Sequence, residues 1–461
     1  MHPNPSVFFQ SCITLLKQSE QEIPEFIGWE LIETTRNSIQ HLYQNNNGKL
    51  SAHQKRTVEA ISYHLEVFTN NGKTMGTGSL NIQVFHDIKD RINIVIEMAK
   101  NSHNPSWNLL KPPAEPYPKV ITADLEIVTN VNSVLNKLEG EIEDAISESK
   151  NVIVNSAELF LNSESIQRYT NTGIKTYKVG SSVYFEIAME PDQENNTQEV
   201  LNIKTSLSAN DLNLKDFILK TAQETLTLGH TSEPKTSEDV NILVNEDVIA
   251  DLCLAIQSQL SCAREYHRLP CLQAGQEIYD LKNRKKGSSP LNITLDPFLP
   301  AMTDSSAYTG EGLVAKKAQI INDGKVMFQL INNRFGQYLN KEPNGITGNM
   351  LVDTDAYSYD ELKTKEENVI EIIKFSSLLV DSQKMTWSSE IKLAKQYHSD
   401  GTYTMIKGGV MSGNIWDNFA DAMFSSNTGI VNFPPNSYND AKGYVGPAWM
   451  LIRKGVSVVG V

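Results

Sequence analysis

Cysteine is scarce in this sequence of 461 residues, which has four, at Cys12, Cys253, Cys262 and Cys271. So few thiols in so long a chain are typical of reduced cysteines and not of a secreted disulfide framework. No stretch of about 18 apolar residues occurs, which argues against a transmembrane helix. Residues 1–20 lack the basic start and the apolar stretch of a signal peptide, so we expect none. These absences predict a cytoplasmic protein.

Positive charge is in the minority, with 41 lysines and arginines against 55 acidic residues and a formal net charge of −14. The densest basic run, residues 282–286, is short, and a solvated loop explains it better than a nucleic-acid surface does. No P-loop or dinucleotide-binding fingerprint occurs, and the serine pairs at 305–306 and 425–426 lack the context of a nucleophilic serine. The sequence therefore predicts no nucleic-acid binding and no cofactor.

The composition, with 40% hydrophobic and 21% charged residues, is that of a globular protein, and the length favours two domains. For the N-terminal part, the residue patterns predict helices at 5–19, 26–43, within 85–102, 131–150 and 211–228, and strands at 60–68, 74–84, 151–161, 169–176 and 182–189. Strands 60–68 and 74–84 should form a hairpin, residues 190–199 should form a loose hairpin tip, and five prolines in 104–119 predict an irregular crossing.

Small polar residues and proline at 229–238 predict a domain boundary. The predicted domains are 1–230 and 239–461. The second begins with a buried strand at 240–244 and a helix at 246–265, and is then rich in strands and glycine. The predicted fold class is α+β, with an N-terminal mixed α/β sheet domain followed by a strand-rich, mainly antiparallel C-terminal domain.

Glycines in the second domain stand where the chain must turn. Gly324 lies in the segment Asn322–Lys325 between two apolar runs, which predicts a tight hairpin. Gly348 and Gly413 are each followed by asparagine, a residue that tolerates left-handed backbone, at the points where a strand turns or a helix begins. We expect positive φ at both glycines.

Four blocks of the second domain, in order, resemble the TldD/PmbA family, formerly called modulators of DNA gyrase. They are residues 309–339 with the acidic turn TGEG, 344–352, 400–419 with the turn GGVMSGN, and the terminal strands of 443–460. A weaker resemblance extends upstream to about residue 58. The motif positions to which we assign structural roles are Gly310, Glu311, Gly312, Gly324, Gly348, Asn349, Gly413, Asn414, Gly446 and Pro447.

The protease branch of that family carries His-Glu-x-x-x-His on the helix after the strand equivalent to 240–244, and a C-terminal cysteine completes its zinc site. The corresponding helix here, Val248–His267, has no His-Glu pair, and no cysteine follows Cys271. The resemblance therefore implies the zinc-free PmbA/TldE-like branch, with no catalytic residue and no metal. It also implies a non-catalytic subunit that pairs with a zinc-bearing TldD-like subunit or with itself, and acts on unfolded peptides.

Two alternatives stay open from the sequence. One is a metallopeptidase with atypical zinc ligands, His267 with Cys262 or Cys271, although Pro270 argues against one continuous helix through them. Cys253 and Cys262 are nine residues apart, which places them on opposite faces of a helix. The other alternative is a homodimeric module that binds peptides without cleaving them.

Overall fold

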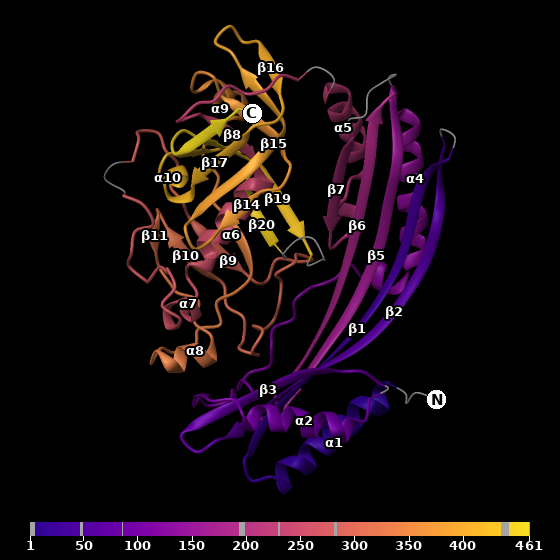
Figure 1. Cartoon of the computed structure of the whole chain (residues 1–461), viewed down its shortest axis with the longest axis vertical. Helices are drawn as coiled ribbons and strands as arrows, with labels where there is room; N and C mark the ends of the chain where they lie inside the picture. Colours follow the sequence, from indigo (N-terminus) through magenta and orange to yellow (C-terminus); the bar gives the residue numbers. More distant parts are fainter. Residues whose placement is uncertain are drawn as a thin grey trace.

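The computed structural model describes residues 5–46, 49–84, 86–192, 199–228, 231–280, 284–434 and 442–460. A long curved sheet forms the N-terminal part, and a compact β-rich part lies beside it (Figure 1). Helices are fewer than strands, and most strand pairs are antiparallel, so the predicted α+β class is confirmed. Within the described ranges, no helix combines the length and the apolar character that crossing a membrane requires.

The N-terminal sheet is antiparallel throughout, in the order β4-β3-β2-β1-β5-β6-β7. Its longest strands curve along one side of the molecule (Figure 1). The strands are β1 (Phe26–Asn46), β2 (Lys49–Asn70), β3 (Thr74–Ile82), β4 (Asn104–Pro105), β5 (Val152–Thr170), β6 (Lys175–Pro191) and β7 (Val200–Ser206). The predicted hairpin about Asn70–Lys73 is the β2–β3 turn.

Helices cover one face of this sheet near both of its ends. Alternate residues of a strand point to the same face, and along β1 Leu31 packs with α1 and α2 whereas Ile39 and Tyr43 pack with α4 and α5. The helices are α1 (Pro5–Glu22), α2 (Ile88–Lys100), α3 (Leu125–Thr129), α4 (Val131–Glu148), the 3₁₀ turn η1 (Ala209–Asp211) and α5 (Leu214–Thr227). The β1 residues that alternate with Leu31, Ile39 and Tyr43, such as Glu30, point to the opposite face of the sheet, toward the C-terminal part.

Several predicted elements differ from the structure. Residues 26–43, predicted as a helix, form β1, because β2 and β5 bond to it on both sides. Residues 169–176, predicted as a strand, contain the turn between β5 and β6. The helix predicted at 246–265 breaks into two after Ser258. The loose tip predicted at 190–199 lies largely outside the described residues, as does part of the basic run 282–286.

The C-terminal part contains two more sheets around one large apolar core. One has the order β11-β10-β9-β12-β20-β19, and the other has the order β18-β21-β8-β13-β15-β17-β22, with β14 and β16 also paired to β15. Only the pairs β12–β20 and β8–β13 are parallel in the described sheets, so the mainly antiparallel character predicted for this part is confirmed.

The strands of this part are β8 (Ile242–Asn245), β9 (Ile293–Asp296), β10 (Ala318–Asn322), β11 (Lys325–Val326), β12 (Asn349–Val352), β13 (Ile370–Phe375), β14 (Leu379–Asp381), β15 (Thr386–Tyr397), β16 (Tyr403–Ile406), β17 (Val410–Asn414), β18 (Ala422–Phe424), β19 (Thr428–Phe433), β20 (Lys442–Pro447), β21 (Trp449–Ile452) and β22 (Val456–Val459). Its helices are α6 (Glu246–Ser258), α7 (Cys262–Tyr266), α8 (Asn333–Tyr338), α9 (Tyr359–Thr364) and α10 (Ile415–Ala420). The apolar face of α6 belongs to the large core, which fixes the direction of the helix.

The predicted boundary at 229–238 stays a prediction. Its described residues bond to the C-terminal part: the amide of Ser232 donates to the Met405 carbonyl at 2.9 Å, and Ser237 and Val458 exchange two hydrogen bonds of 2.9 Å. Residues 231–238 therefore run along the C-terminal part as its first segment.

Replacing Gly140 by alanine should raise the free energy of unfolding by about 0.5–1 kcal/mol, because glycine inside a helix costs backbone entropy. Gly140 is exposed in the middle of α4, its φ is not positive, and an added Cβ would meet nothing within 4 Å. Urea titration of the two proteins measures the difference. Equal or lower stability of the variant would contradict the assignment of this position as a simple helical site.

Candidate functional site at the domain junction

The helix α6 begins where the resemblance places a metal-binding helix. Asn245 caps it, with its side-chain oxygen 3.4 Å from the amide of Val248, and Glu246 lies in the first turn. Burial raises the pKa of Glu246. One turn further, Asp251 forms an ion pair with Lys442 of β20, whose side chain is nearly inaccessible. A carboxylate–ammonium pair thus lies beside the start of α6.

These residues do not fit a zinc ion. A catalytic zinc requires about three protein ligands and an open position for water, whereas the Asn245 oxygen caps the helix and Asp251 is paired with a buried ammonium that would repel a dication. The described residues contain no group of three His, Cys, Asp or Glu side chains placed to hold a metal.

The alternative ligands are also not grouped to hold a metal among the described residues. Cys253 and Cys262 are buried, and burial raises the pKa of both thiols, which disfavours the thiolate that binds metal. The Cys262 sulfur lies 3.7 Å from the Asn332 side-chain oxygen, whereas His267 packs against Phe335, with ring centroids 5.2 Å apart. Among the residues that the structure describes, Cys262, His267 and Cys271 therefore form no zinc site.

The acidic turn Gly310–Gly312 lies at the junction of the two parts. Glu311 accepts hydrogen bonds from the amides of Asn333 and Arg334, at 2.6 and 3.4 Å, and so neutralises the N-terminus of α8. The Gly310 carbonyl accepts from Arg168 of β5 at 2.7 Å, and the Gly312 carbonyl accepts from Tyr117 of the proline-rich crossing at 2.6 Å. Gly312 has a φ of +99°. The turn connects the sheet, the crossing and the C-terminal part.

A cavity of about 270 Å³ lies at this junction. The sheet contributes Glu30, Glu66 and Arg168, the crossing contributes Trp107, and α8 contributes Arg334. Glu30 and Glu66 stand directly opposite each other on β1 and β2. Burial and the neighbouring Glu30 raise the pKa of Glu66. Apart from Glu311, the charged residues of this cavity were missed by the sequence reasoning, because they come from four separate segments.

Four other motif positions have local backbone roles. Gly324 has a φ of +71° in the β10–β11 hairpin, as its turn chemistry predicts. Gly348 has the expected positive φ, +126°. The expectation for Gly413 is wrong: its φ is not positive, and it lies so close to the indole of Trp387 that an added Cβ would be 2.5 Å from the ring nitrogen. Asn414 caps α10 by accepting from two amides at 3.0 and 3.2 Å.

The remaining motif positions are packed inside the C-terminal part. Asn349 is fully buried, donates to Ser305 at 3.0 Å and accepts from the amide of Asp304 at 3.0 Å. At the end of β20, the Pro447 carbonyl accepts from the hydroxyl of Tyr444 at 3.1 Å, and Gly446 leaves room for that hydroxyl. Of the ten motif residues, only those of the Gly310–Gly312 turn belong to the junction.

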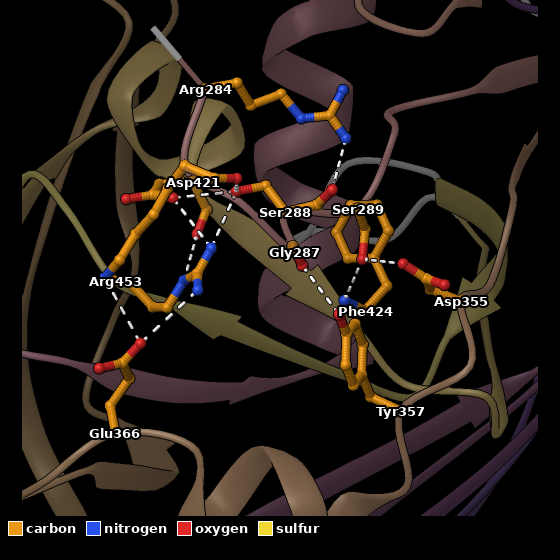
Figure 2. A network of polar contacts seen from close by, with 11 residues as sticks. Arg284, Gly287, Ser288, Ser289, Asp355, Tyr357, Glu366, Asp421, Phe424 and Arg453 are labelled. Atoms are coloured by element: carbon orange, nitrogen blue, oxygen red, sulfur yellow. Dashed lines mark hydrogen bonds and ion pairs between the residues drawn. The ribbon is translucent and has the colours of Figure 1, made fainter.

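A buried polar network in the C-terminal part was also missed by the sequence reasoning. Figure 2 shows Arg453 between Asp421 and Glu366, with its guanidinium 2.9 Å from the Asp421 carboxylate and 3.5 Å from that of Glu366. Arg453 also donates to Ser288 at 2.8 Å. The neighbouring Ser289 bonds to Asp355 at 2.6 Å. The network attaches the segment before β9 to the ends of β18 and β21. The only sign of it in the sequence was one arginine directly after an apolar strand.

The fold and the junction together define a protein in which a curved antiparallel sheet meets a β-rich part built of two sheets. Residues 237–455 match the family model described as the PmbA/TldA metallopeptidase C-terminal domain, so the C-terminal part of the chain is a domain of the TldD/PmbA family. No curated protein matches the sequence.

Solved structures share the fold over the whole chain. TldE from Thermococcus kodakarensis has a TM-score of 0.74 at 14% identity, covering 97% of this chain and 99% of that chain. A modulator of DNA gyrase from Bacteroides thetaiotaomicron has a TM-score of 0.77 at 13% identity, covering 100% of each chain. Another modulator of DNA gyrase, from Thermotoga maritima, has a TM-score of 0.69 at 15% identity, covering 99% of this chain and 100% of that chain. At such identities the likeness is one of fold.

Proposed function

We propose that this chain is a non-catalytic, PmbA/TldE-like subunit of a TldD-type metallopeptidase complex that processes or degrades unfolded peptides in the cytoplasm. In this proposal it dimerises with a zinc-bearing TldD-like subunit. The observation that carries the proposal is the start of α6, where an asparagine cap and the Asp251–Lys442 ion pair occupy the place of a zinc-binding motif.

A peptide-binding role is supported by two neighbouring sheet edges. Among the described strand pairs, β7 bonds only to β6, and β19 bonds only to β20. The two edge strands lie against each other across the domains, and Ile430 of β19 and Leu201 of β7 are exposed. An extended peptide can add to such an edge through main-chain hydrogen bonds, which tolerate many sequences.

The pure chain should contain no stoichiometric zinc and should not cleave an unfolded peptide in a chelator-sensitive manner. Without a metal to lower its pKa, water is a poor nucleophile at neutral pH. Elemental analysis of protein purified without a chelating column, followed by cleavage assays on unfolded casein with and without chelator, measures both points. Activity should appear when a partner carrying His-Glu-x-x-x-His is added, and it should then exceed that of the partner alone.

The variant His267→Ala, with the exposed His53→Ala as a matched control, tests the atypical-ligand alternative. Chelator-sensitive cleavage by the pure chain that His267→Ala removes and His53→Ala retains would overturn the proposal in favour of a metallopeptidase. A stable homodimer that binds casein and is unaffected by the zinc-bearing partner would contradict it in favour of an independent peptide-binding module.

A further inference from the structure

The junction cavity contains one carboxylate without a partner. Arg168 already pairs with Glu30, and Glu311 is used by the amides at the start of α8. Glu66, in contrast, makes no direct hydrogen bond or ion pair in the described part of the chain, although nearby positive charges, Arg334 among them, offset part of the rise in its pKa. Its cross-strand neighbour Glu30 carries the same charge, and like charges directly opposite on a sheet are destabilising. A positive ligand group in direct contact with Glu66 would therefore add the charge-assisted hydrogen bond that the more distant cations do not make.

The same cavity contains one cation without a carboxylate partner. The guanidinium of Arg334 donates to Tyr338 at 3.2 Å and to Asn104 at 2.8 Å, and it lies over the ring of Trp107, 4.6 Å from the centroid. It acts electrostatically on Glu66, but no direct ion pair joins it to an acidic side chain in the described part of the chain. Because a guanidinium binds a carboxylate with two parallel hydrogen bonds, this side of the cavity favours a carboxylate ligand.

Between these two charges the wall is apolar. It is formed by the ring of Phe68 on β2, by Trp107 and Leu109 of the crossing, and by Ile174 in the β5–β6 turn. The rings of Phe68 and Trp107 meet edge to face at 5.8 Å. A small concave site with an apolar wall and a few convergent polar groups is the usual form of a small-molecule site.

We propose that the junction cavity binds a small zwitterion of the amino-acid type, a free amino acid or a dipeptide with an apolar side chain. Its ammonium group contacts Glu66, its carboxylate contacts Arg334, and its side chain packs on Phe68 and Trp107. Both ligand charges are needed because Glu66 and Arg334 interact only at a distance, and neither makes a direct ion pair with a described residue. The inference rests on the cavity alone and is independent of the peptidase-subunit role.

Calorimetric titration of the full chain with L-leucine, L-phenylalanine and L-leucyl-glycine should give saturable binding at one site per chain for at least one of the three. N-acetyl-L-leucine lacks the ammonium charge and L-leucinamide lacks the carboxylate, so each should bind weaker by about tenfold or more. Binding of L-leucine or L-phenylalanine without L-leucyl-glycine would identify the ligand as a free amino acid. Binding of L-leucyl-glycine alone would identify it as a dipeptide.

The variants Glu66→Gln and Arg334→Gln should each weaken binding about tenfold or more, whereas Glu59→Gln, an exposed position on the same strand, should leave it unchanged. Glu66→Gln should keep the melting temperature of the parent protein or exceed it, because it removes one of two opposed like charges. No saturable binding of any of the three ligands would overturn the proposal. L-leucinamide binding as tightly as L-leucine, or Glu66→Gln binding as the parent protein does, would also overturn it.

Discussion

Replacing Arg453 by methionine should lower the free energy of unfolding by about 3–5 kcal/mol, the usual cost of removing one partner from a buried ion pair. The side chain of Arg453 is 3% exposed and that of Asp421 is 11% exposed. Without the guanidinium, the Asp421 carboxylate would keep, among the described residues, only its hydrogen bond from Ser288, at 2.9 Å. The loss comes mainly from leaving this charge buried without a counterion.

Urea or thermal unfolding followed by circular dichroism measures the loss. Lys454→Met is the matched control, because Lys454 is the next residue, is 58% exposed and pairs with Asp417 at 3.4 Å on the surface. Exposed pairs contribute about 0–1 kcal/mol. The double variant Arg453→Met with Asp421→Leu should recover part of the stability, because no buried charge then remains unpaired. A cost within 1 kcal/mol for Arg453→Met alone would contradict this account of the network.

Replacing Gly348 by valine should abolish the native fold, with an expected cost above about 4–5 kcal/mol. Two effects add at this position. Its φ of +126° is strained for a β-branched residue. An added Cβ would also lie 2.3 Å from the backbone carbon of Asp296 and the nitrogen of Pro297, and backbone atoms in adjacent segments cannot move aside as a flexible side chain can.

Soluble yield and the near-ultraviolet circular dichroism spectrum measure the outcome. Gly401→Val separates the two effects, because Gly401 has a φ of +84° but no atom within 4 Å of an added Cβ. It should cost only the backbone strain, about 1–3 kcal/mol, and stay folded. Gly413→Val tests the steric effect alone, because an added Cβ would clash with the indole of Trp387 although φ is not positive there. This variant should also reduce the soluble yield. A soluble Gly348→Val protein with parental stability would refute the close-packing assignment.

Local chemistry explains which parts of the fold were predictable from the sequence. The turn at Asn322–Lys325 needs only its own residues, and Asp323 and Gly324 take the positive φ values of 44° and 71° that such a hairpin requires. The helix prediction for residues 26–43 failed because the middle of this segment, around Thr34, has polar residues on both faces. Its strand state depends on Ser62 and Ile166, which flank Thr34 in the sheet.

The candidate site could be anticipated only in part. Glu311 was singled out with its turn, since acidic and glycine residues at this spacing carried the family resemblance. Glu66 and Arg334 gave no signal, because each is one ordinary charge in its own segment, and the cavity exists only after the sheet and α8 meet. The absence of a zinc motif from α6 could be predicted from its own residues. Its ion pair with Lys442 could not, because Lys442 follows Asp251 by 191 residues.

The order of pairing in the long sheet has a consequence for how the chain folds as it is synthesised. The strands β1, β2 and β3 form consecutive hairpins, and β5, β6 and β7 do the same, but a single ladder, from Glu30 opposite Thr170 to Gln44 opposite Ser156, joins the two groups. Until residue 170 has left the ribosome, β1 presents a long open edge to other nascent chains. While only the first half of the sheet has formed, the open edge of β1 can therefore pair with other chains. Pairing of β5 with β1 covers this edge.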